Sequence, residues 1–183
     1  MTAMTPGIEL LPGGQPRLAA GNWRVDPARS YASFAGRVAD WQVRGCLPLT
    51  GGVLIREPVG DSTARLAARA SAVSTGSLGL DRLLAGPGFL DAGTFPEISF
   101  RSELLVWVPA GWRAVGRLQV KGTEHDLACQ LDLHYGDTKS DSSRRIIIVS
   151  SWVIDSRWVT SRRIPGLGRR IVMTCSSFLE PDT

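Results

Sequence analysis

Residues 75–100 read TGSLGLDRLLAGPGFLDAGTFPEISF, and this stretch decides how the rest of the chain is interpreted. It begins with a Thr-Gly turn, after which a short helical segment is expected. Gly86-Pro87-Gly88 ends that segment, because proline lacks a backbone donor and the flanking glycines favour turn geometry. A new strand is expected next, since Ile98 and Phe100 alternate with polar residues. A helical insertion near residues 78–91 therefore interrupts a series of strands.

Outside this stretch, apolar side chains recur with a period of two. In the clearest example, Leu127, Cys129, Leu131 and Leu133 alternate with polar residues. Such alternation is typical of a strand with one buried face. We expect about eight strands at hairpin spacing and no long helix, which predicts an antiparallel barrel or sandwich. A closed barrel removes the edge strands that otherwise promote aggregation.

Several motifs resemble those of the YceI family, lipocalin-like proteins that bind polyisoprenoids. The family stretch that corresponds to residues 75–100 reads roughly T-G-N-x-x-R-D-x-H-L-x-S-x-D-F-F-D and continues, after three residues, with Y-P-x-I-x-F. WRVDPARS at residues 23–30 is similar to the family opening W-x-I-D-P-x-H-S, and GRLQVKGT at residues 116–123 is similar to G-x-L-T-I-x-G-V-T. The matching positions of the central stretch are Thr75, Gly76, Asp81, Leu84, Phe89, Asp91, Pro96, Ile98 and Phe100.

The resemblance extends over residues 23–180. It implies an all-β fold, an eight-stranded antiparallel lipocalin-like barrel, and a polyisoprenoid or similar lipid as the ligand. The chain departs from the family signature at Ser77, Leu80, Leu83 and Gly88. Leu80 and Leu83 stand where the family has Arg and His, so two polar groups that could meet a ligand head group are replaced by apolar side chains.

The formal net charge of the 183 residues is +4, and the excess lies near the C-terminus. Residues 144–183 contain seven basic and three acidic side chains, with arginines paired as Arg144-Arg145, Arg162-Arg163 and Arg169-Arg170. These pairs are interpreted first as solvated strand ends and loops, and second as a basic rim that attracts phosphate or an anionic membrane surface. They are not interleaved with an identifiable DNA- or RNA-binding motif, so no nucleic acid is expected as a partner.

Residues 1–21, rich in proline and glycine, are expected to form a flexible N-terminal extension before a barrel domain at residues 22–183. The extension has neither the basic start nor the long apolar run of a signal peptide. Cys46, Cys129 and Cys175 are an odd number without CxxC spacing, so we expect reduced cysteines buried in the core. Such cysteines are typical of a reducing compartment, and we expect a cytoplasmic protein.

The sequence contains no pattern that indicates catalysis, a metal or a cofactor. His134 shares the polar face of its strand with Asp126 and Asp132, and we expect it to face solvent. Neither metal-ligand spacing, nor a nucleophile elbow, nor a phosphate-binding loop is present. Asp81 and Asp91 flank the helical insertion, where they either cap backbone donors or orient a ligand head group. The sequence therefore predicts a non-enzymatic protein.

Small residues on the inner face of the expected strand 64–73 leave space inside the barrel. An eight-stranded barrel is just wide enough to be filled by its own side chains or to hold one small ligand. Our first hypothesis is a carrier of a long apolar amphiphile, a polyisoprenoid or similar lipid, in the barrel lumen. Each methylene group removed from water stabilises such binding by about 0.8 kcal/mol. The side chains expected to line the lumen are Phe34, Leu66, Ala68, Ala70, Phe89, Phe95, Ile98, Phe100, Leu118, Val120 and Trp152.

The alternative hypothesis is a barrel filled by its own side chains. Such a barrel would act as an interaction module for a protein or a membrane surface through its C-terminal arginines. Ile147, Val149 and Val153 are apolar residues in the second phase of the expected strand 145–160, and they offer a surface for a homodimer.

Overall fold

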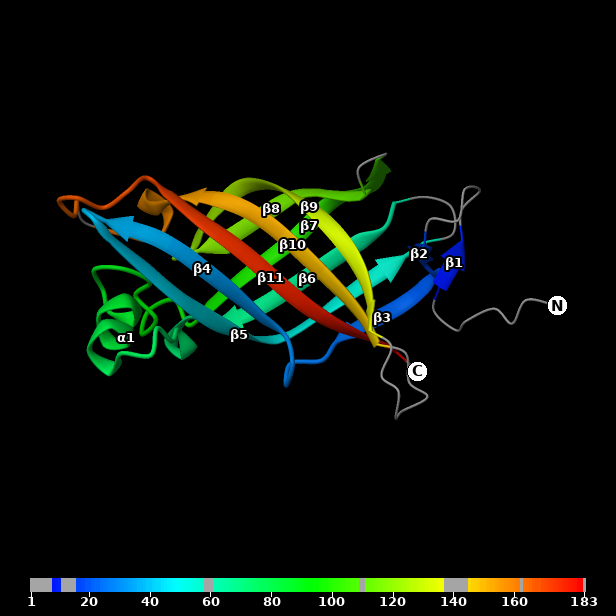
Figure 1. Cartoon of the computed structure of the whole chain (residues 1–183), viewed down its shortest axis with the longest axis horizontal. Helices are drawn as coiled ribbons and strands as arrows, with labels where there is room; N and C mark the ends of the chain where they lie inside the picture. Colours follow the sequence, from blue (N-terminus) through cyan, green and yellow to red (C-terminus); the bar gives the residue numbers. More distant parts are fainter. Residues whose placement is uncertain are drawn as a thin grey trace.

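The computed structural model describes residues 8–10, 16–57, 61–108, 111–136, 145–161 and 163–182. Over this part of the chain, antiparallel strands follow one another and one α-helix interrupts them (Figure 1). The elements are β1 (Ile8–Leu10), β2 (Pro16–Leu18), β3 (Gly21–Val25), β4 (Tyr31–Val38), β5 (Trp41–Arg56), β6 (Thr63–Arg69), η1 (Ala70–Ala72), α1 (Leu78–Ala85), β7 (Glu97–Val108), β8 (Gly111–Val120), β9 (Thr123–Gly136), β10 (Arg145–Asp155), η2 (Ser156–Trp158) and β11 (Arg170–Pro181).

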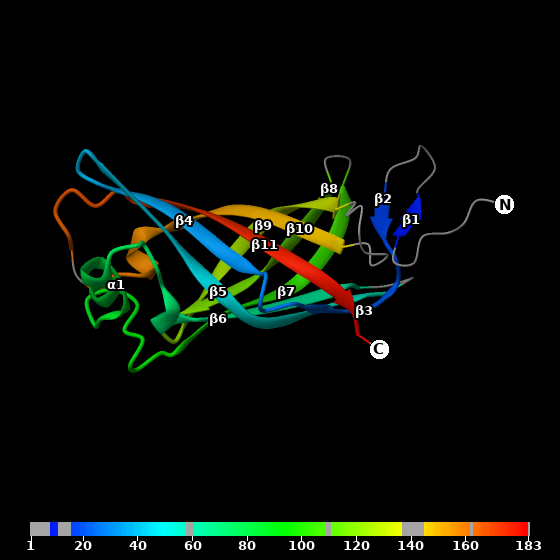
Figure 2. The ribbon, with the colours of Figure 1, turned by 60° about the horizontal axis from the view of Figure 1, so that its bottom comes forward.

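Eight of the described strands close into an antiparallel barrel. From β4 to β11 each strand pairs with the next one in the sequence, and β11 then pairs with β4. Ala32 lies opposite Cys175 and Phe34 opposite Met173 in the pair that closes the ring. Figure 2 shows the strands wrapped around a common interior. The predicted eight-stranded antiparallel barrel is confirmed, and the sandwich is excluded.

Strand β3 occupies the same gap between β5 and β11 as β4, at the other end of the barrel. There Trp23 lies opposite Leu54 and Val25 opposite Leu179. The Asp-Pro turn that separates β3 from β4 is held by its own side chain, since the Ala28 amide donates to Asp26 Oδ1 at 2.9 Å. An aspartate that accepts a bond from a backbone amide two residues on is a recurrent turn device.

The period-two pattern determines which side chains enter the barrel. Along β8 every second residue from Trp112 to Val120 is buried, while Arg113, Arg117 and Gln119 are exposed. For β10 the sequence did not indicate which side chains face inward, because both alternating sets of residues contain apolar side chains. Ile146 and Ile154 are buried and Val153 is exposed, so the phase of Ile146 faces inward. The expected strand 145–160 is shorter in the structure, since η2 follows at Ser156.

The helical insertion lies at the end of the barrel away from the chain termini (Figure 1). Helix α1 stops where the sequence predicts, and the chain after Gly86-Pro87-Gly88 folds back beside the helix. The Leu90 amide donates to the Leu84 carbonyl at 3.0 Å, and the Ala92 amide donates to the Ala85 carbonyl at 2.9 Å. These bonds satisfy two carbonyls that the end of the helix leaves without partners. The predicted insertion is therefore confirmed, and we call residues 78–92 the plug.

The segment before the barrel contributes to its opposite end. β1 and β2 pair with each other, and Leu18 is buried beside Leu54, Leu105 and Trp112. Residues 1–7 and 11–15 of the predicted flexible extension lie outside the described residues. The division of the chain into an extension and a domain at residue 22 stays a prediction.

Candidate functional site: the barrel lumen

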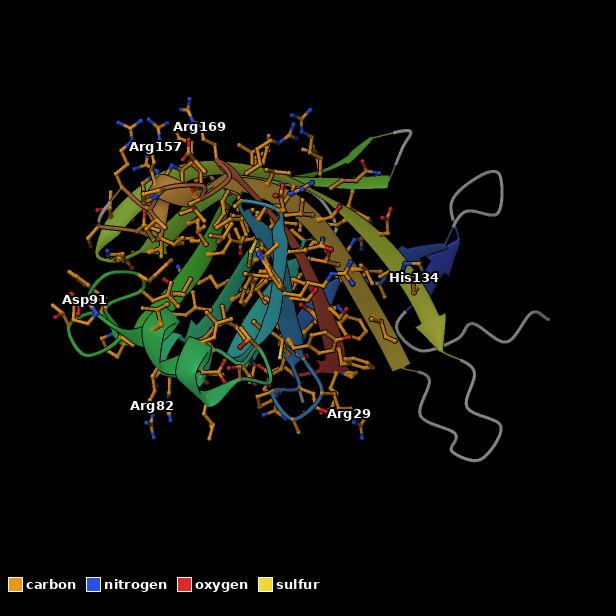
Figure 3. The ribbon with its side chains drawn as sticks, turned by 60° about the vertical axis from the view of Figure 1, so that its left-hand side comes forward. Arg29, Arg82, Asp91, His134, Arg157 and Arg169 are labelled. Atoms are coloured by element: carbon orange, nitrogen blue, oxygen red, sulfur yellow. The ribbon has the colours of Figure 1, made fainter. Side chains whose placement is uncertain are left out.

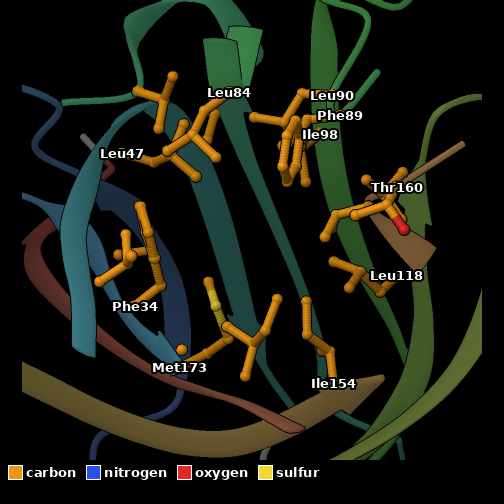
Figure 4. Close-up of a pocket in the computed structure, with 18 of the residues that line it drawn as sticks. Phe34, Leu47, Leu84, Phe89, Leu90, Ile98, Leu118, Ile154, Thr160 and Met173 are labelled. Atoms are coloured by element: carbon orange, nitrogen blue, oxygen red, sulfur yellow. The ribbon is translucent and has the colours of Figure 1, made fainter. Parts of the chain in front are cut away.

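The half of the barrel next to α1 encloses a cavity of about 390 Å³. Its walls come from β4, β5, β6, β7, β8, β10 and β11, and α1 contributes from the end (Figure 4). Small-molecule sites in proteins commonly measure about 300–1,000 Å³. The interior is thus hollow, which argues against the barrel filled by its own side chains that we considered as the alternative.

Most of the side chains that we expected in the lumen line this cavity. Phe34, Leu118 and Phe89 approach it from three different directions (Figure 4). Ala70 and Phe95 do not line it. The lining residues among those predicted are Phe34, Leu66, Ala68, Phe89, Ile98, Phe100, Leu118, Val120 and Trp152.

The prediction for Ala70 is corrected by where its strand ends. We expected residues 64–73 to continue as one strand, which would put Ala70 in phase with Ala68. β6 ends at Arg69 instead, and Ala70 begins the η1 turn. The Ala70 amide donates to the Pro96 carbonyl at 2.9 Å, and its side chain is fully buried in the core. Ala70 therefore packs in the core, and Ala68 lines the lumen.

The prediction for Phe95 is corrected by a turn on the neighbouring hairpin. Lys121 and Gly122 both have positive φ, 52° and 70°, as a two-residue hairpin turn of type I′ requires. A β-carbon added to Gly122 would lie 2.6 Å from Phe95 Cε1, so the ring lies directly against this turn. Phe95 thus packs on the β8–β9 turn and not in the lumen.

The leucines of α1 are lumen residues that were not predicted from the sequence. Leu80, Leu83 and Leu84 all line the cavity. They are spaced three and four residues apart, which places them on one face of a helix. That spacing was visible in the sequence, but only the closed barrel shows that this face covers the lumen. Leu80 and Leu83 are the positions where the family signature has Arg and His.

Further lumen residues come from β5, β11 and the segment between β10 and β11. Inward-facing positions of β11 could have been recognised from the alternation of Ile171, Met173 and Cys175. The segment that follows η2 has no such periodicity, so its contribution depends on the tertiary structure. The additional apolar lining residues from these parts are Val43, Leu47, Leu49, Val159, Ile164, Leu167, Ile171, Met173 and Cys175, and Ile154 of β10 also lines the cavity.

The lining contains few polar side chains. Arg37, Ser99 and Thr160 are the residues with charged or hydroxyl side chains among those that line the cavity. Arg37 is exposed, and Ser99 Oγ donates to Gln119 Oε1 on the outside of the barrel at 3.4 Å. Among the described residues, no group of three or more His, Cys, Asp or Glu side chains could hold a metal ion. The lumen therefore offers apolar contact rather than an acid–base pair.

Both aspartates of the insertion have structural partners. Asp81 Oδ1 accepts bonds from the Thr75 amide at 2.7 Å and from Thr75 Oγ1 at 2.6 Å, which ties α1 to the chain that enters it. Asp91 has a positive φ of 50° and accepts a bond from Thr94 Oγ1 at 3.2 Å. Neither residue lines the cavity. Of the two interpretations, stabilisation of backbone and turn fits these contacts.

The two histidines lie away from the lumen lining. His134 is exposed on β9 (Figure 3). The ring of His125 stacks on that of Trp158, with centroids 4.3 Å apart and planes 10° from parallel. Trp158 belongs to η2, so this contact supports the segment that leads into the lumen wall.

Asp155 holds η2 in place at the end of β10. Its carboxylate accepts bonds from the Arg157 amide at 2.9 Å and from the Arg157 guanidinium at 2.7 Å and 3.0 Å, and Arg169 lies 3.6 Å away. The Arg157 guanidinium and amide hold the pKa of Asp155 well below its usual range. Val159 and Thr160 line the cavity directly after this turn.

The cysteines are free thiols, as expected. Cys129 and Cys175 are buried, and Cys46 is partly buried. Burial raises the pKa of Cys129 to about 11, with the nearby Cys175 contributing. Burial also raises the pKa of Cys175, the thiol that touches the lumen. Since the thiolate is the nucleophile, burial makes the thiols of Cys129 and Cys175 poor nucleophiles.

No helix in the described part of the chain is long and apolar enough to cross a lipid bilayer.

Comparison with known proteins gives one family and several similar folds. A family model described as a YceI-like domain matches residues 23–164. No curated protein matches the chain. Burkholderia cenocepacia BcnA has a similar structure, with a TM-score of 0.69 and 15% identity over 84% of this chain and 98% of that one.

Two further solved structures have similar folds, with comparable TM-scores and identities. A polyisoprenoid binding domain from Saccharophagus degradans, implicated in plant cell wall breakdown, has a TM-score of 0.62 and 12% identity over 87% of this chain and 98% of that one. A Campylobacter jejuni YCEI protein has a TM-score of 0.64 and 16% identity over 77% of this chain and 85% of that one. At such low identity these likenesses establish the fold.

Proposed function

Because the chain belongs to the YceI-like domain family, we propose that its barrel is a binding protein for a long apolar amphiphile, a polyisoprenoid or a similar lipid. The apolar chain of the ligand lies in the lumen, and its polar end lies near α1. The observation that carries the proposal is the hollow, almost wholly apolar interior of about 390 Å³. The neighbour described as a polyisoprenoid binding domain supports this ligand class.

Burial of the ligand chain provides the affinity in this proposal. Each methylene group moved from water into the lumen contributes about 0.8 kcal/mol, so a long chain binds without a single charged contact. A polar head group that entered the lumen would lose its hydrogen bonds to water, and that loss costs free energy. The head group is therefore expected to stay at the open end.

The lining also supports a role in binding without chemistry. Of its residues, Thr160 and Ser99 carry hydroxyl groups, and neither has a described histidine or carboxylate as a hydrogen-bond partner. A catalytic serine or threonine depends on an adjacent base. The replacement of the family's Arg and His by Leu80 and Leu83 makes the α1 face of the lumen apolar too.

The test fills the lumen with one additional side chain. Ala68 lies on the wall, opposite Leu49 on one side and Ile98 on the other. In Ala68→Phe the added ring displaces about two methylene groups of a bound chain, which corresponds to roughly tenfold weaker binding. We would titrate lipid-free protein with tritiated farnesol and with a longer tritiated polyprenol. Saturable binding to the wild type and roughly tenfold weaker binding to Ala68→Phe are the expected results.

The matched control is Ala128→Phe. Ala128 is exposed on the outside of β9 and does not line the cavity, so this variant should bind as the wild type does. Equal affinities of Ala68→Phe and Ala128→Phe would place the ligand outside the lumen. Mass spectrometry of the intact protein from its own host, under native conditions, would identify a ligand that copurifies.

We also propose a cytoplasmic location. The free thiols of Cys46, Cys129 and Cys175 support it, because unpaired cysteines persist in reducing compartments. Fractionation of the host cells should recover the protein in the cytosol, and recovery from an exported fraction would contradict the proposal.

A further inference from the structure

Among the residues that line the cavity, Arg37 and Leu83 are exposed, so we place the lumen opening at the end of the barrel next to α1. This end is built by elements that are far apart in the sequence. They are α1, the hairpin between β4 and β5, and the segment between η2 and β11. The hairpin and the segment are joined, since the Ala39 amide donates to the Gly166 carbonyl at 2.6 Å and Val38 forms an isolated bridge with Leu167. Figures 1 and 2 both show these elements at the end of the barrel away from the termini.

The segment between η2 and β11 is also bonded to the plug on the other side. The Ser161 amide donates to the Gly88 carbonyl at 3.1 Å, and Ser161 Oγ donates to the Pro87 carbonyl at 3.3 Å. Lys121 Nζ donates to Ser161 Oγ. The three elements thus form one rim, which we define as residues 38–41, 78–89, 159–161 and 163–169.

Large apolar side chains project from this rim into solvent. Trp41 is 79% exposed and Leu78 is 78% exposed, and both lie outside the lumen lining. Leu83 is 56% exposed and does line the cavity, so it connects the outer surface with the interior. The other large exposed apolar side chains of the described residues are at most half exposed, and they lie on strands. The rim therefore carries the most exposed apolar groups of the described molecule.

Basic side chains lie on the same rim as these apolar groups. Arg82 extends from α1 on one side of the rim, and Arg169 extends on the other side (Figure 3). Arg163, in the segment between η2 and β11, is also exposed. The acidic residues of the hairpin tip and the helical insertion are Asp40, Asp81 and Asp91, of which Asp81 accepts bonds from Thr75. Asp155 is already paired with Arg157 and Arg169. The arginines contribute a positive surface around the lumen opening.

We propose that this rim docks on an anionic lipid bilayer, with Trp41 and Leu78 inserted among the head groups and the arginines over the phosphates. The inference rests on the proposed function and specifies how its ligand is exchanged. Tryptophan and leucine beside basic residues suit the interface between head groups and acyl chains. Docking would align the lumen opening with the bilayer, so an apolar chain could enter the barrel without crossing water.

The test compares binding of the full-length protein to two kinds of vesicle. One contains phosphatidylcholine alone, and the other contains about 30% phosphatidylglycerol, which gives the surface a negative potential. We expect the wild type to cosediment with the anionic vesicles, and binding to fall as salt screens the arginines. The double variant Trp41→Ser/Leu78→Ser should lose at least about tenfold in its partition onto them.

The control removes a pair of smaller exposed apolar side chains from another face. Val153 and Val172 lie opposite each other on β10 and β11, and are 40% and 50% exposed. Val153→Ser/Val172→Ser should bind vesicles as the wild type does. The triple variant Arg82→Gln/Arg163→Gln/Arg169→Gln should lose the preference for the anionic vesicles.

A farnesol titration separates docking from ligand binding. Trp41→Ser/Leu78→Ser should bind farnesol as the wild type does, because neither residue lines the lumen. A wild type that binds farnesol but neither kind of vesicle would overturn the docking and leave the proposed function intact. Vesicle binding without farnesol binding would overturn the proposed function.

Two outcomes would assign the rim to another role. Unchanged vesicle binding by Trp41→Ser/Leu78→Ser would show that the rim is not the docking surface. Self-association in solution that this variant abolishes, together with no vesicle binding by the wild type, would identify a second copy of the chain as the occupant and overturn the membrane proposal.

Discussion

Gly116 shows how closely two strands of the barrel approach each other. It lies opposite Ser102, at the bulge of β7 where the register shifts between Ser102 and Leu104. A β-carbon at this position would lie 2.1 Å from the Arg101 carbonyl oxygen and 2.6 Å from Ser102 Cα. Both atoms belong to the backbone, so no side-chain rotation could make room.

We predict that Gly116→Ala lowers the free energy of unfolding by about 2–3 kcal/mol, the usual cost of overpacking a well-packed interior. Chemical denaturation monitored by tryptophan fluorescence measures the difference. Gly79→Ala is the control, because nothing lies within 4 Å of a β-carbon at Gly79 in α1. Alanine there should be neutral or slightly stabilising, since it is the better helix former. Equal stability of the two variants would contradict the close approach of β7 and β8.

Among the elements of the barrel, the turn η2 is held by a single carboxylate, that of Asp155. Asp155 accepts bonds from both the amide and the guanidinium of Arg157. Neither side chain is deeply buried, so these bonds, and not packing, orient them. The Ser156 amide also donates to the Arg169 carbonyl at 2.8 Å, which brings the start of β11 beside η2. Since Val159 and Thr160 follow directly, this turn shapes the lumen wall.

We predict a pH dependence from the lowered pKa of Asp155. A carboxyl whose pKa is lower in the folded state stabilises the fold above the unfolded-state pKa, about 3.9, and loses that contribution as the pH falls towards the folded-state value. Asp155→Asn should therefore lower Tm by about 1–2 °C at neutral pH, a small effect because Arg157 is exposed. The difference from the wild type should shrink progressively below about pH 4.

Thermal unfolding from pH 3 to pH 8 checks this expectation. Asp126→Asn, a change of an exposed carboxylate on β9, is the control and should leave Tm nearly unchanged. A deficit of Asp155→Asn that is as large in acid as at neutral pH would show that the carboxylate acts through something other than its charge.

The whole barrel should become more stable when the lumen is occupied. A ligand that binds the folded chain alone raises the free energy of unfolding by about 2.7 kcal/mol at a free concentration 100 times its Kd. We predict that farnesol raises the Tm of the wild type and of Ala128→Phe in proportion to the logarithm of its concentration. Ala68→Phe should show a clearly smaller shift at each concentration, because its affinity is roughly tenfold weaker. A shift of equal size in all three proteins would indicate that farnesol binds elsewhere.

The homodimer predicted from the sequence concerns the whole molecule, and it stays a prediction. Val153 is exposed on the outer face of β10, while Ile147 and Val149 are partly buried. Analytical ultracentrifugation of the wild type and of Val153→Ser would show whether this face joins two copies.

The sequence by itself determined the strands, their order and most of their inward faces. Alternation with a period of two acts over neighbouring residues, so it identified Leu118 and Val120 correctly without any knowledge of the partners. Gly86-Pro87-Gly88 ended the helix for an equally local reason. The family motifs then predicted closure into a barrel.

Only the tertiary structure decided which inward-facing residues meet the open lumen and which pack in solid core. That distinction depends on the position along the barrel axis and on where each strand ends, and neither is a local property. Ala70 does not line the lumen because β6 ends at Arg69, directly before it, and Phe95 packs against a turn that is distant in sequence. Leu80 and Leu83 line the lumen because ring closure brings α1 over its end.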